Sequence, residues 1–239
     1  MSRRSVFSLL FVVVLLCSGF FAWQVFSYYQ KIVNGTISLQ DIPRYSFADK
    51  LTTSRLARAA ATTTPVNVDV ASTDDPSLGS NDAPLTIVEF ADFGCPYSRE
   101  ASYAIRRAAQ TYGSLVHYIY RDFPLTDLHP EAELAAEAGG CANEQDQFWA
   151  FHDKLYANQQ DLSRSALIDY AAQVGMSTQK FESCLNSGKY KTEVAEDVAA
   201  GSKAGVYGTP TFFFNGHVVE GSIPAETLGK IIEAFMPRS

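Results

Sequence analysis

The stretch Phe90-Ala91-Asp92-Phe93-Gly94-Cys95-Pro96-Tyr97-Ser98 decides the fold of this 239-residue chain. The apolar residues before it predict a buried strand at 85–91, and the residues after it predict a helix at 98–112 that ends at Gly113. Cys95 therefore lies where a strand turns into a helix, and the N–H groups at a helix N-terminus stabilise a thiolate. Because the thiolate is the reactive form, Cys95 is a candidate nucleophile; the alternative is a small buried apolar residue.

The rest of the chain predicts a mixed order of strands and helices. A β-branched and aromatic run predicts a strand at 116–120, and Asn215-Gly216 predicts a hairpin between strands at 211–214 and 217–220. Helices are expected at 130–140, 144–156, 164–174, 178–185, 192–204 and 224–235. This order indicates one α/β domain over residues 81–239, with a helical insert at about 126–190.

The N-terminus predicts a membrane location. Arg3 and Arg4 precede a mostly apolar stretch at 6–26, which is long enough to span a bilayer as a helix. The arginine pair favours a cytoplasmic N-terminus, so we expect a single-pass anchor at 1–29, with a cleaved signal peptide as the alternative. Residues 30–80 are small, polar and rich in proline, which is typical of a linker. The domain is then expected on the extracytoplasmic side of the cell membrane, where disulfides persist.

Composition and cysteine spacing exclude two classes of function. The formal net charge is −7, so nucleic acid is not an expected partner. Cys17, Cys95, Cys141 and Cys184 are too far apart in sequence for a Cys-x-x-Cys or zinc pattern, so neither a metal nor another cofactor is expected.

Several separated motifs carry a resemblance to a known family. They are Asn81-Asp82-Ala83-Pro84, Cys95-Pro96-Tyr97, Phe123-Pro124-Leu125 with His129-Pro130, Gly208-Thr209-Pro210-Thr211-Phe212, and the pair Cys141 and Cys184. Over residues 76–237 the chain resembles the DsbA-like thiol–disulfide oxidoreductases of bacterial cell envelopes. The resemblance implies a thioredoxin-like fold with an inserted helical subdomain, preceded here by a transmembrane helix. It fails at Ser98, where the family has a second redox cysteine.

The resemblance also implies roles for residues around the cysteine. Glu89 matches a partly buried acid that helps proton transfer; the alternative is a strand carboxylate that reaches solvent. Thr209-Pro210 matches a loop that carries a cis-proline beside the redox cysteine, where the Thr209 backbone pairs with a substrate peptide. The alternative for this loop is a plain turn. Pro96 and Tyr97 are expected to restrict the turn and cover the sulfur, or simply to start the helix.

The other two cysteines of the domain are expected to pair with each other. Cys141 and Cys184 lie on neighbouring predicted helices, and an oxidising compartment favours a structural disulfide. The alternative is that one of them resolves a mixed disulfide at Cys95, which requires Cα atoms within about 7 Å. His129 is interpreted as a cap for the helix that Pro130 opens, with a hydrogen bond near the site as the alternative.

Ser98 constrains the expected chemistry. Its hydroxyl can hydrogen-bond a thiolate at Cys95 but cannot store oxidising equivalents. We expect a membrane-anchored thiol–disulfide oxidoreductase or isomerase that forms mixed disulfides with cysteine-containing envelope or secreted proteins. A low-molecular-weight thiol or a redox partner protein would release Cys95. The alternatives are a redox-inactive chaperone or assembly factor that binds peptides beside Pro210, and a thiol peroxidase.

Overall fold

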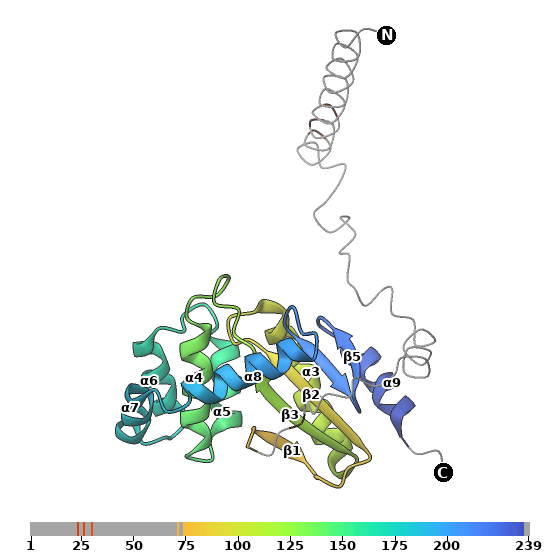
Figure 1. Ribbon diagram of the computed structural model, residues 1–239, viewed down its shortest axis with the longest axis horizontal. Coiled ribbons are helices and arrows are strands. Elements are labelled where there is room, and N and C mark those ends of the chain that lie inside the picture. Colours follow the sequence, from red (N-terminus) through yellow and green to blue (C-terminus); the bar gives the residue numbers. More distant parts are fainter. Residues whose placement is uncertain (1–22, 24–25, 27–29, 31–70, 72–73, 237–239) are drawn as a thin grey trace. The chain divides into compact units, whose positions relative to one another are not determined.

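The computed structural model describes residues 74–236, together with residues 23, 26, 30 and 71 (Figure 1). Most of the predicted anchor at 1–29 and most of the predicted linker at 30–80 lie outside these residues. Among the residues that are described, no helix is long and apolar enough to cross a membrane. The domain described below lies within the compact unit Phe47–Ser239.

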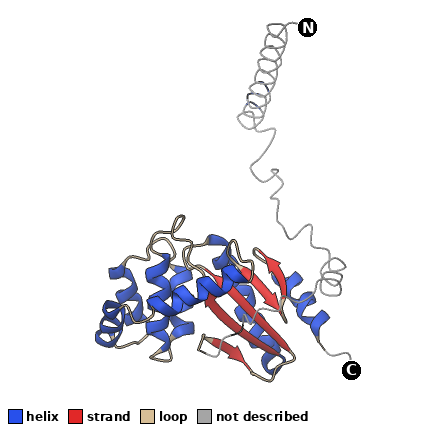
Figure 2. Ribbon diagram, in the orientation of Figure 1, coloured by secondary structure: helices blue, strands red, loops and turns tan. Residues whose placement is uncertain are grey.

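The centre of the domain is a five-stranded sheet in the order β1-β3-β2-β4-β5 (Figure 2). Strands β2 and β3 are parallel, whereas the other neighbouring pairs are antiparallel. The strands are β1 (Ser77–Gly79), β2 (Leu85–Ala91), β3 (Val116–Asp122), β4 (Thr211–Phe214) and β5 (His217–Glu220). Strand β1 lies within the stretch predicted as a linker, so the sheet begins before the expected boundary at residue 81.

Helices cover both faces of this sheet. Side chains alternate between the two faces along β2, so each face presents apolar residues that helices can cover. Leu85 and Ile87 belong to the core that includes α3 (Pro96–Tyr112) and α9 (Ala225–Phe235). Val88 and Phe90 point to the opposite face and pack in a second cluster, against which Val198 of α8 (Lys191–Lys203) lies. Figure 1 shows α8 crossing the front of the sheet.

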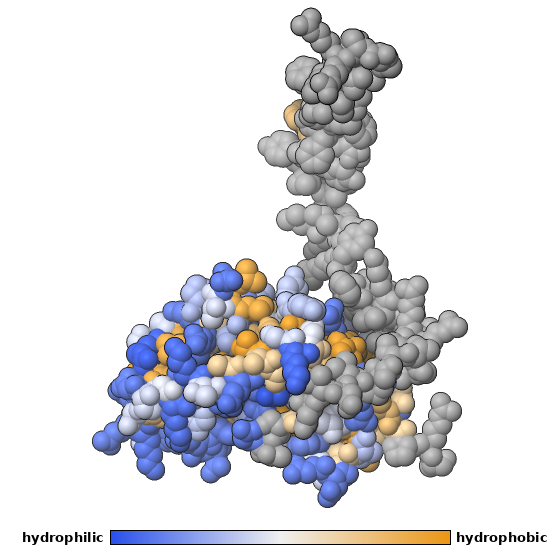
Figure 3. All heavy atoms as spheres, viewed as in Figure 1, coloured by the Kyte–Doolittle hydropathy of each residue, from blue (hydrophilic) through white to orange (hydrophobic). Residues whose placement is uncertain are grey.

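The remaining helices form the insert between β3 and α8. They are α4 (Ala132–Asn143), α5 (Phe148–Ala157), α6 (Arg164–Gln173) and α7 (Thr178–Ser187), and the short 3-10 helix η2 (Gly113–Leu115) precedes β3. The helix expected to begin at residue 144 begins at Phe148, because Asp146 takes a positive φ of 56° in the intervening turn. Figure 3 shows largely hydrophilic side chains over the end formed by α6 and α7, whereas hydrophobic ones gather nearer the middle.

Candidate active site at Cys95

Cys95 occupies the N-cap position of α3. Its backbone is extended, with φ −81° and ψ 122°, and Pro96 follows as the first helical residue. Proline is favoured there because its fixed φ suits a helix start and its missing N–H has no helical partner to lose. The side chain is 4% exposed. Its sulfur therefore lies at the N-terminus of a 17-residue helix, where the helix dipole favours negative charge.

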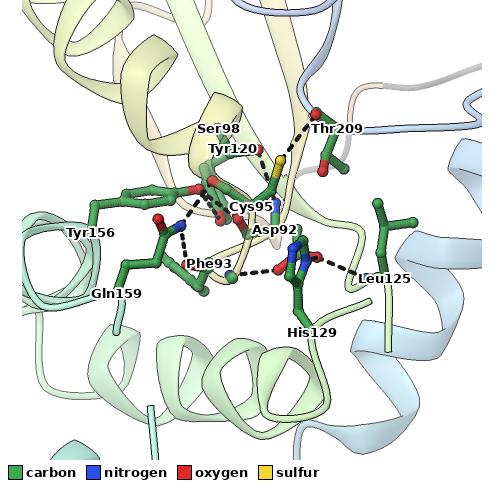
Figure 4. A network of polar contacts seen from close by, with 11 residues as sticks. Asp92, Phe93, Cys95, Ser98, Tyr120, Leu125, His129, Tyr156, Gln159 and Thr209 are labelled. Atoms are coloured by element: carbon green, nitrogen blue, oxygen red, sulfur yellow. Dashed lines mark hydrogen bonds and ion pairs between the residues drawn. The ribbon is translucent and has the colours of Figure 1, made fainter. Parts of the chain in front are cut away.

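The sulfur faces a loop that is distant in sequence. The Cys95 S–H donates a hydrogen bond to the backbone oxygen of Thr209 at 3.2 Å (Figure 4). The Thr209–Pro210 peptide bond is cis. Sheet register explains the meeting, because Thr211 at the start of β4 pairs with Phe90 near the end of β2. The structure thus brings the predicted nucleophile and the predicted cis-proline loop together.

Ser98 does not contact the sulfur through a hydrogen bond. Its side chain is fully buried, and its hydroxyl oxygen accepts from the backbone N–H of Asp92 at 3.4 Å. Within residues 74–236, the Cys95 side chain has no hydrogen bond from Ser98, and no side chain caps α3. Tyr97 is 62% exposed and lies at the surface beside the site. In this arrangement the Ser98 oxygen accepts from Asp92, and a hydrogen bond from Ser98 to a Cys95 thiolate stays a prediction.

Glu89 is fully buried, which excludes the alternative of a carboxylate that reaches solvent. The Tyr118 hydroxyl donates to Glu89 Oε2 at 2.6 Å, and Oε1 has no partner in the part of the chain that is described. Burial raises the pKa of Glu89 to about 8, against a lowering effect of the Tyr118 hydrogen bond. The Glu89 carboxyl therefore holds its proton at neutral pH. Its hydrogen bond runs to Tyr118 on β3 rather than to Cys95.

Sequence reasoning missed the side chains that hold the turn before Cys95. The Asp92 carboxylate accepts from Gly94 N at 2.6 Å, from Leu125 N at 2.9 Å and from His129 Nδ1 at 2.7 Å. The His129 backbone oxygen also accepts from Ala132 N at 3.0 Å, ahead of α4. The alternative for His129, a hydrogen bond near the site, is thus what the structure shows, whereas the expected cap is wrong: α4 begins at Ala132 and has Glu131 at its N-cap. No local sequence pattern marks Asp92, because its partners Leu125 and His129 lie more than thirty residues away in the chain.

Gln159 is a second missed contact, and it comes from the insert. Its Nε2 donates to the backbone oxygens of Phe93 at 2.7 Å and Cys95 at 2.8 Å. The residue lies just after α5, in a polar segment that gives no sign of a role. Its position follows only from the packing of the insert against the end of β2.

Cys141 of α4 and Cys184 of α7 form a disulfide with a Cα–Cα distance of 5.8 Å. Among the described residues, Cys95 is the only free cysteine. Neither insert cysteine is available to resolve a disulfide at Cys95 while this bond is intact.

An acidic cluster lies elsewhere in the domain. Single ligand atoms of Asp75, Glu193 and Asp197 lie within 4.8 Å of one another, a spacing at which carboxylates can hold a metal ion. Arg121 Nε lies 2.9 Å from Asp75 Oδ2 and donates to Asp197 Oδ1 at 2.8 Å. The guanidinium therefore already supplies a cation to two of these carboxylates.

The fold and the site together define a class of protein. The Cys-Pro turn lies between β2 and α3, and a cis-proline loop just before the neighbouring strand β4 faces it. This is the arrangement of a thioredoxin-type thiol–disulfide site. A family model described as thioredoxin matches residues 71–234, and the chain belongs to that family.

Solved structures agree with this assignment. A thioredoxin-like oxidoreductase from Silicibacter pomeroyi is 26% identical, with a TM-score of 0.62 over 69% of this chain and 93% of that one. The thiol-disulfide exchange protein alpha-DsbA2 from Wolbachia pipientis shares the fold, with 17% identity and a TM-score of 0.64 over 77% of this chain and 97% of that one. These comparisons support an enzyme of the oxidoreductase type with a DsbA-like fold.

A further relative is a much longer protein that is named for ion transport. The Na(+)/H(+) antiporter NhaA 3 of Salinispora tropica is 38% identical over 196 residues. The match covers 80% of this chain but 30% of the antiporter. The chain therefore spans less than a third of this relative, and the named transport activity belongs to that longer protein.

Proposed function

We propose that this domain is a thiol–disulfide exchange enzyme that acts through Cys95 alone. The observation that carries the proposal is the sulfur at the N-terminus of α3, 3.2 Å from the Thr209 oxygen, with a serine at the fourth position of the motif. The Cys95 thiolate attacks one sulfur of a substrate disulfide and forms a mixed disulfide. The displaced sulfur leaves with the electron pair of the broken bond and takes a proton from solvent.

The second half of the cycle needs a thiol from outside the motif. A thiolate of the substrate, of a low-molecular-weight thiol or of a redox partner attacks the mixed disulfide and releases Cys95 as a thiolate. If the attacking thiolate belongs to the same substrate, the net result is a rearranged disulfide. If it comes from another molecule, the substrate is reduced. Net oxidation of a dithiol is disfavoured because Ser98 cannot form a disulfide with Cys95.

The surroundings of the sulfur favour a polypeptide substrate. The Thr209 backbone oxygen already faces Cys95, and an extended peptide can pair with this loop as an added strand does. Tyr97 and Tyr207 are 62% and 88% exposed on the two segments that flank the contact. Aromatic side chains supply apolar contact area at low entropic cost, so these two residues suit binding of a polypeptide. The proposed substrates are cysteine-containing envelope or secreted proteins.

The test is direct capture of the intermediate. The protein is incubated with an oxidised peptide of known sequence, quenched with acid and analysed by mass spectrometry. We expect a mixed disulfide at Cys95 in the wild type and none in Cys95→Ser. A protein that binds the reduced peptide equally well with either residue, and forms no adduct, would instead be a redox-inactive chaperone.

The proposed location is the extracytoplasmic face of the cell membrane, and the apolar stretch at 6–26 supports it. We expect the full-length chain to stay with membranes after an alkaline carbonate wash, with its N-terminal residues intact by peptide mapping. A released form that begins near residue 22 would show that a signal peptide is cleaved instead.

A further inference from the structure

The turn that presents Cys95 is held by a buried carboxylate that the exchange chemistry does not use. The Asp92 side chain is fully buried, and one of its oxygens accepts from Gly94 N at 2.6 Å. The other oxygen accepts from His129 Nδ1 at 2.7 Å and from Leu125 N at 2.9 Å (Figure 4). The carboxylate therefore joins the turn before α3 to the loop between β3 and α4.

The hydrogen bond to Asp92 fixes which nitrogen of His129 carries a hydrogen. A carboxylate in this position accepts, so Nδ1 donates whether the ring is neutral or charged. Nε2 has no hydrogen-bond partner in the described part of the chain, and the side chain is 23% exposed. Gly94 lies beneath the ring, because a Cβ added there would stand 2.5 Å from His129 Cβ. The absence of a side chain at Gly94 permits His129 to approach the residue before Cys95.

Gln159 holds the same turn through different atoms. Its amide nitrogen donates to the carbonyl oxygens of Phe93 and Cys95 at 2.7 and 2.8 Å. The Cys95 oxygen also accepts from Arg99 N at 3.1 Å, within the first turn of α3. The residue that carries the sulfur is thus tied both to its own helix and to the insert.

We propose that Asp92, His129 and Gln159 are positioning residues for Cys95. They hold the turn in the conformation in which the sulfur meets the Thr209 oxygen, and His129 acts through Nδ1 rather than through Nε2. The inference rests on the proposed exchange function for its kinetic consequence. Its structural content, the conformation of the turn, can be measured without any exchange.

The experiment uses substitutions that separate the two ring nitrogens. Asn places an N–H close to the position of Nδ1, whereas Gln places its polar atoms nearer the position of Nε2. The variants are His129→Asn, His129→Gln, His129→Ala and Gln159→Glu, which keeps the size of the side chain but removes its donors. His217→Asn on β5 is the matched control, because β5 lies at the sheet edge beyond β4.

Two readouts are measured below the unfolding temperature of every variant. The first is the rate of mixed-disulfide formation with a peptide disulfide, and the second is the set of NMR chemical shifts of Cys95. We expect His129→Asn and His217→Asn to keep the wild-type rate within about threefold. His129→Gln, His129→Ala and Gln159→Glu should each slow it about tenfold or more, because small displacements of reacting atoms are costly. The Cys95 shifts should follow the same grouping.

The outcomes separate the possible failures. A rate kept by His129→Gln and lost by His129→Asn would show that Nε2 matters, as for an acid or base, and would overturn the assignment to Nδ1. Wild-type rates and wild-type Cys95 shifts in all variants would show that these residues do not position Cys95 and would overturn the proposal. If the wild type forms no mixed disulfide, the proposed function has failed, and the Cys95 shifts alone then decide whether these residues position the turn.

Discussion

The hydroxyl oxygen of Ser98 lies 3.4 Å from the backbone nitrogen of Asp92 and accepts its hydrogen bond. The fourth residue of the Cys-Pro-Tyr-Ser motif therefore forms a hydrogen bond with the residue that follows β2. Because the Ser98 side chain is buried one turn below Cys95 in α3, a thiol at this position would lie within the motif but out of solvent. In the proposed function, Ser98 is the position that separates single-cysteine exchange from dithiol chemistry.

Ser98→Cys should convert the site to a dithiol site. Serine and cysteine are close in size, so the fold should accept the change. We expect the variant to oxidise a dithiol peptide at least about tenfold faster than the wild type, since the introduced thiol can displace the substrate from the mixed disulfide. Peptide oxidation in a glutathione buffer measures this, with Cys95→Ser as the inactive control. A wild type as fast as the variant would mean that another thiol resolves Cys95.

Cys141→Ser should lower stability without silencing the site. The disulfide to Cys184 closes a loop with a sequence separation of 43 residues, and the chain-entropy model gives a nominal loss of about 3–4 kcal/mol for such a loop. We expect a lower melting temperature, whereas Cys95 in the folded protein should alkylate at the wild-type rate. Peptide mapping of the wild type serves as the control. A fragment with Cys95 linked to Cys184 would contradict the structural role of this pair.

Glu89 should make the domain less stable as the pH rises. Burial raises its pKa to about 8 in the folded state from an ordinary value of 4.5. The stability that depends on the protonated carboxyl is complete below about 4.5 and is lost as the pH rises toward 8, because the unfolded chain ionises first. Glu89→Gln should flatten this dependence, by an amount on the order of a few kcal/mol. Urea denaturation at pH 5 and pH 8 is the measurement. If the free energy of unfolding falls by the same amount between pH 5 and pH 8 in Glu89→Gln as in the wild type, this role for Glu89 is excluded.

The acidic cluster near Arg121 should act in the same direction. Burial, with repulsion from Asp197, raises the pKa of Asp75 to about 7 and that of Glu193 to about 8. The favourable contribution of these protonated groups is again lost as the pH rises above 4 toward 8. Glu193→Gln should therefore stabilise the domain at pH 8 and change little at pH 5. Glu226→Gln, at an exposed position of α9, is the matched control, and a gain of equal size there would point to net charge as the cause.

Much of the fold could be predicted because its signals are local. The apolar run at 85–91 and the Asn215-Gly216 turn predict strands β2, β4 and β5 with the bounds that the structure shows. Strand β3 extends to Asp122, beyond the predicted end at residue 120, because Ala91 at the end of β2 pairs with it. The three residues of β1 have no strand pattern of their own and follow only from pairing with β3.

Only part of the site could be predicted from the sequence. Cys95 could be identified because it lies at a predicted strand-to-helix turn, and the Thr209-Pro210 loop because it matches a motif of the DsbA-like family. The roles of Asp92 and Gln159 could not be predicted, since carboxylates and amides are common in loops and all partners of these side chains except Gly94 lie 33 to 66 residues away. Such contacts exist only once the insert has packed against the sheet.

The place of β4 in the sheet sets when the cysteine site can exist during synthesis. This strand belongs to the last part of the chain, yet it lies directly beside β2, whose end leads to Cys95. A nascent chain that ends before Thr211 leaves one edge of β2 unpaired, and such an edge invites pairing with other chains. Without the pairing of Thr211 with Phe90, the Thr209 oxygen is not held beside the thiol of such a chain. Assembly of the C-terminal hairpin is the step that both closes the sheet and completes the site.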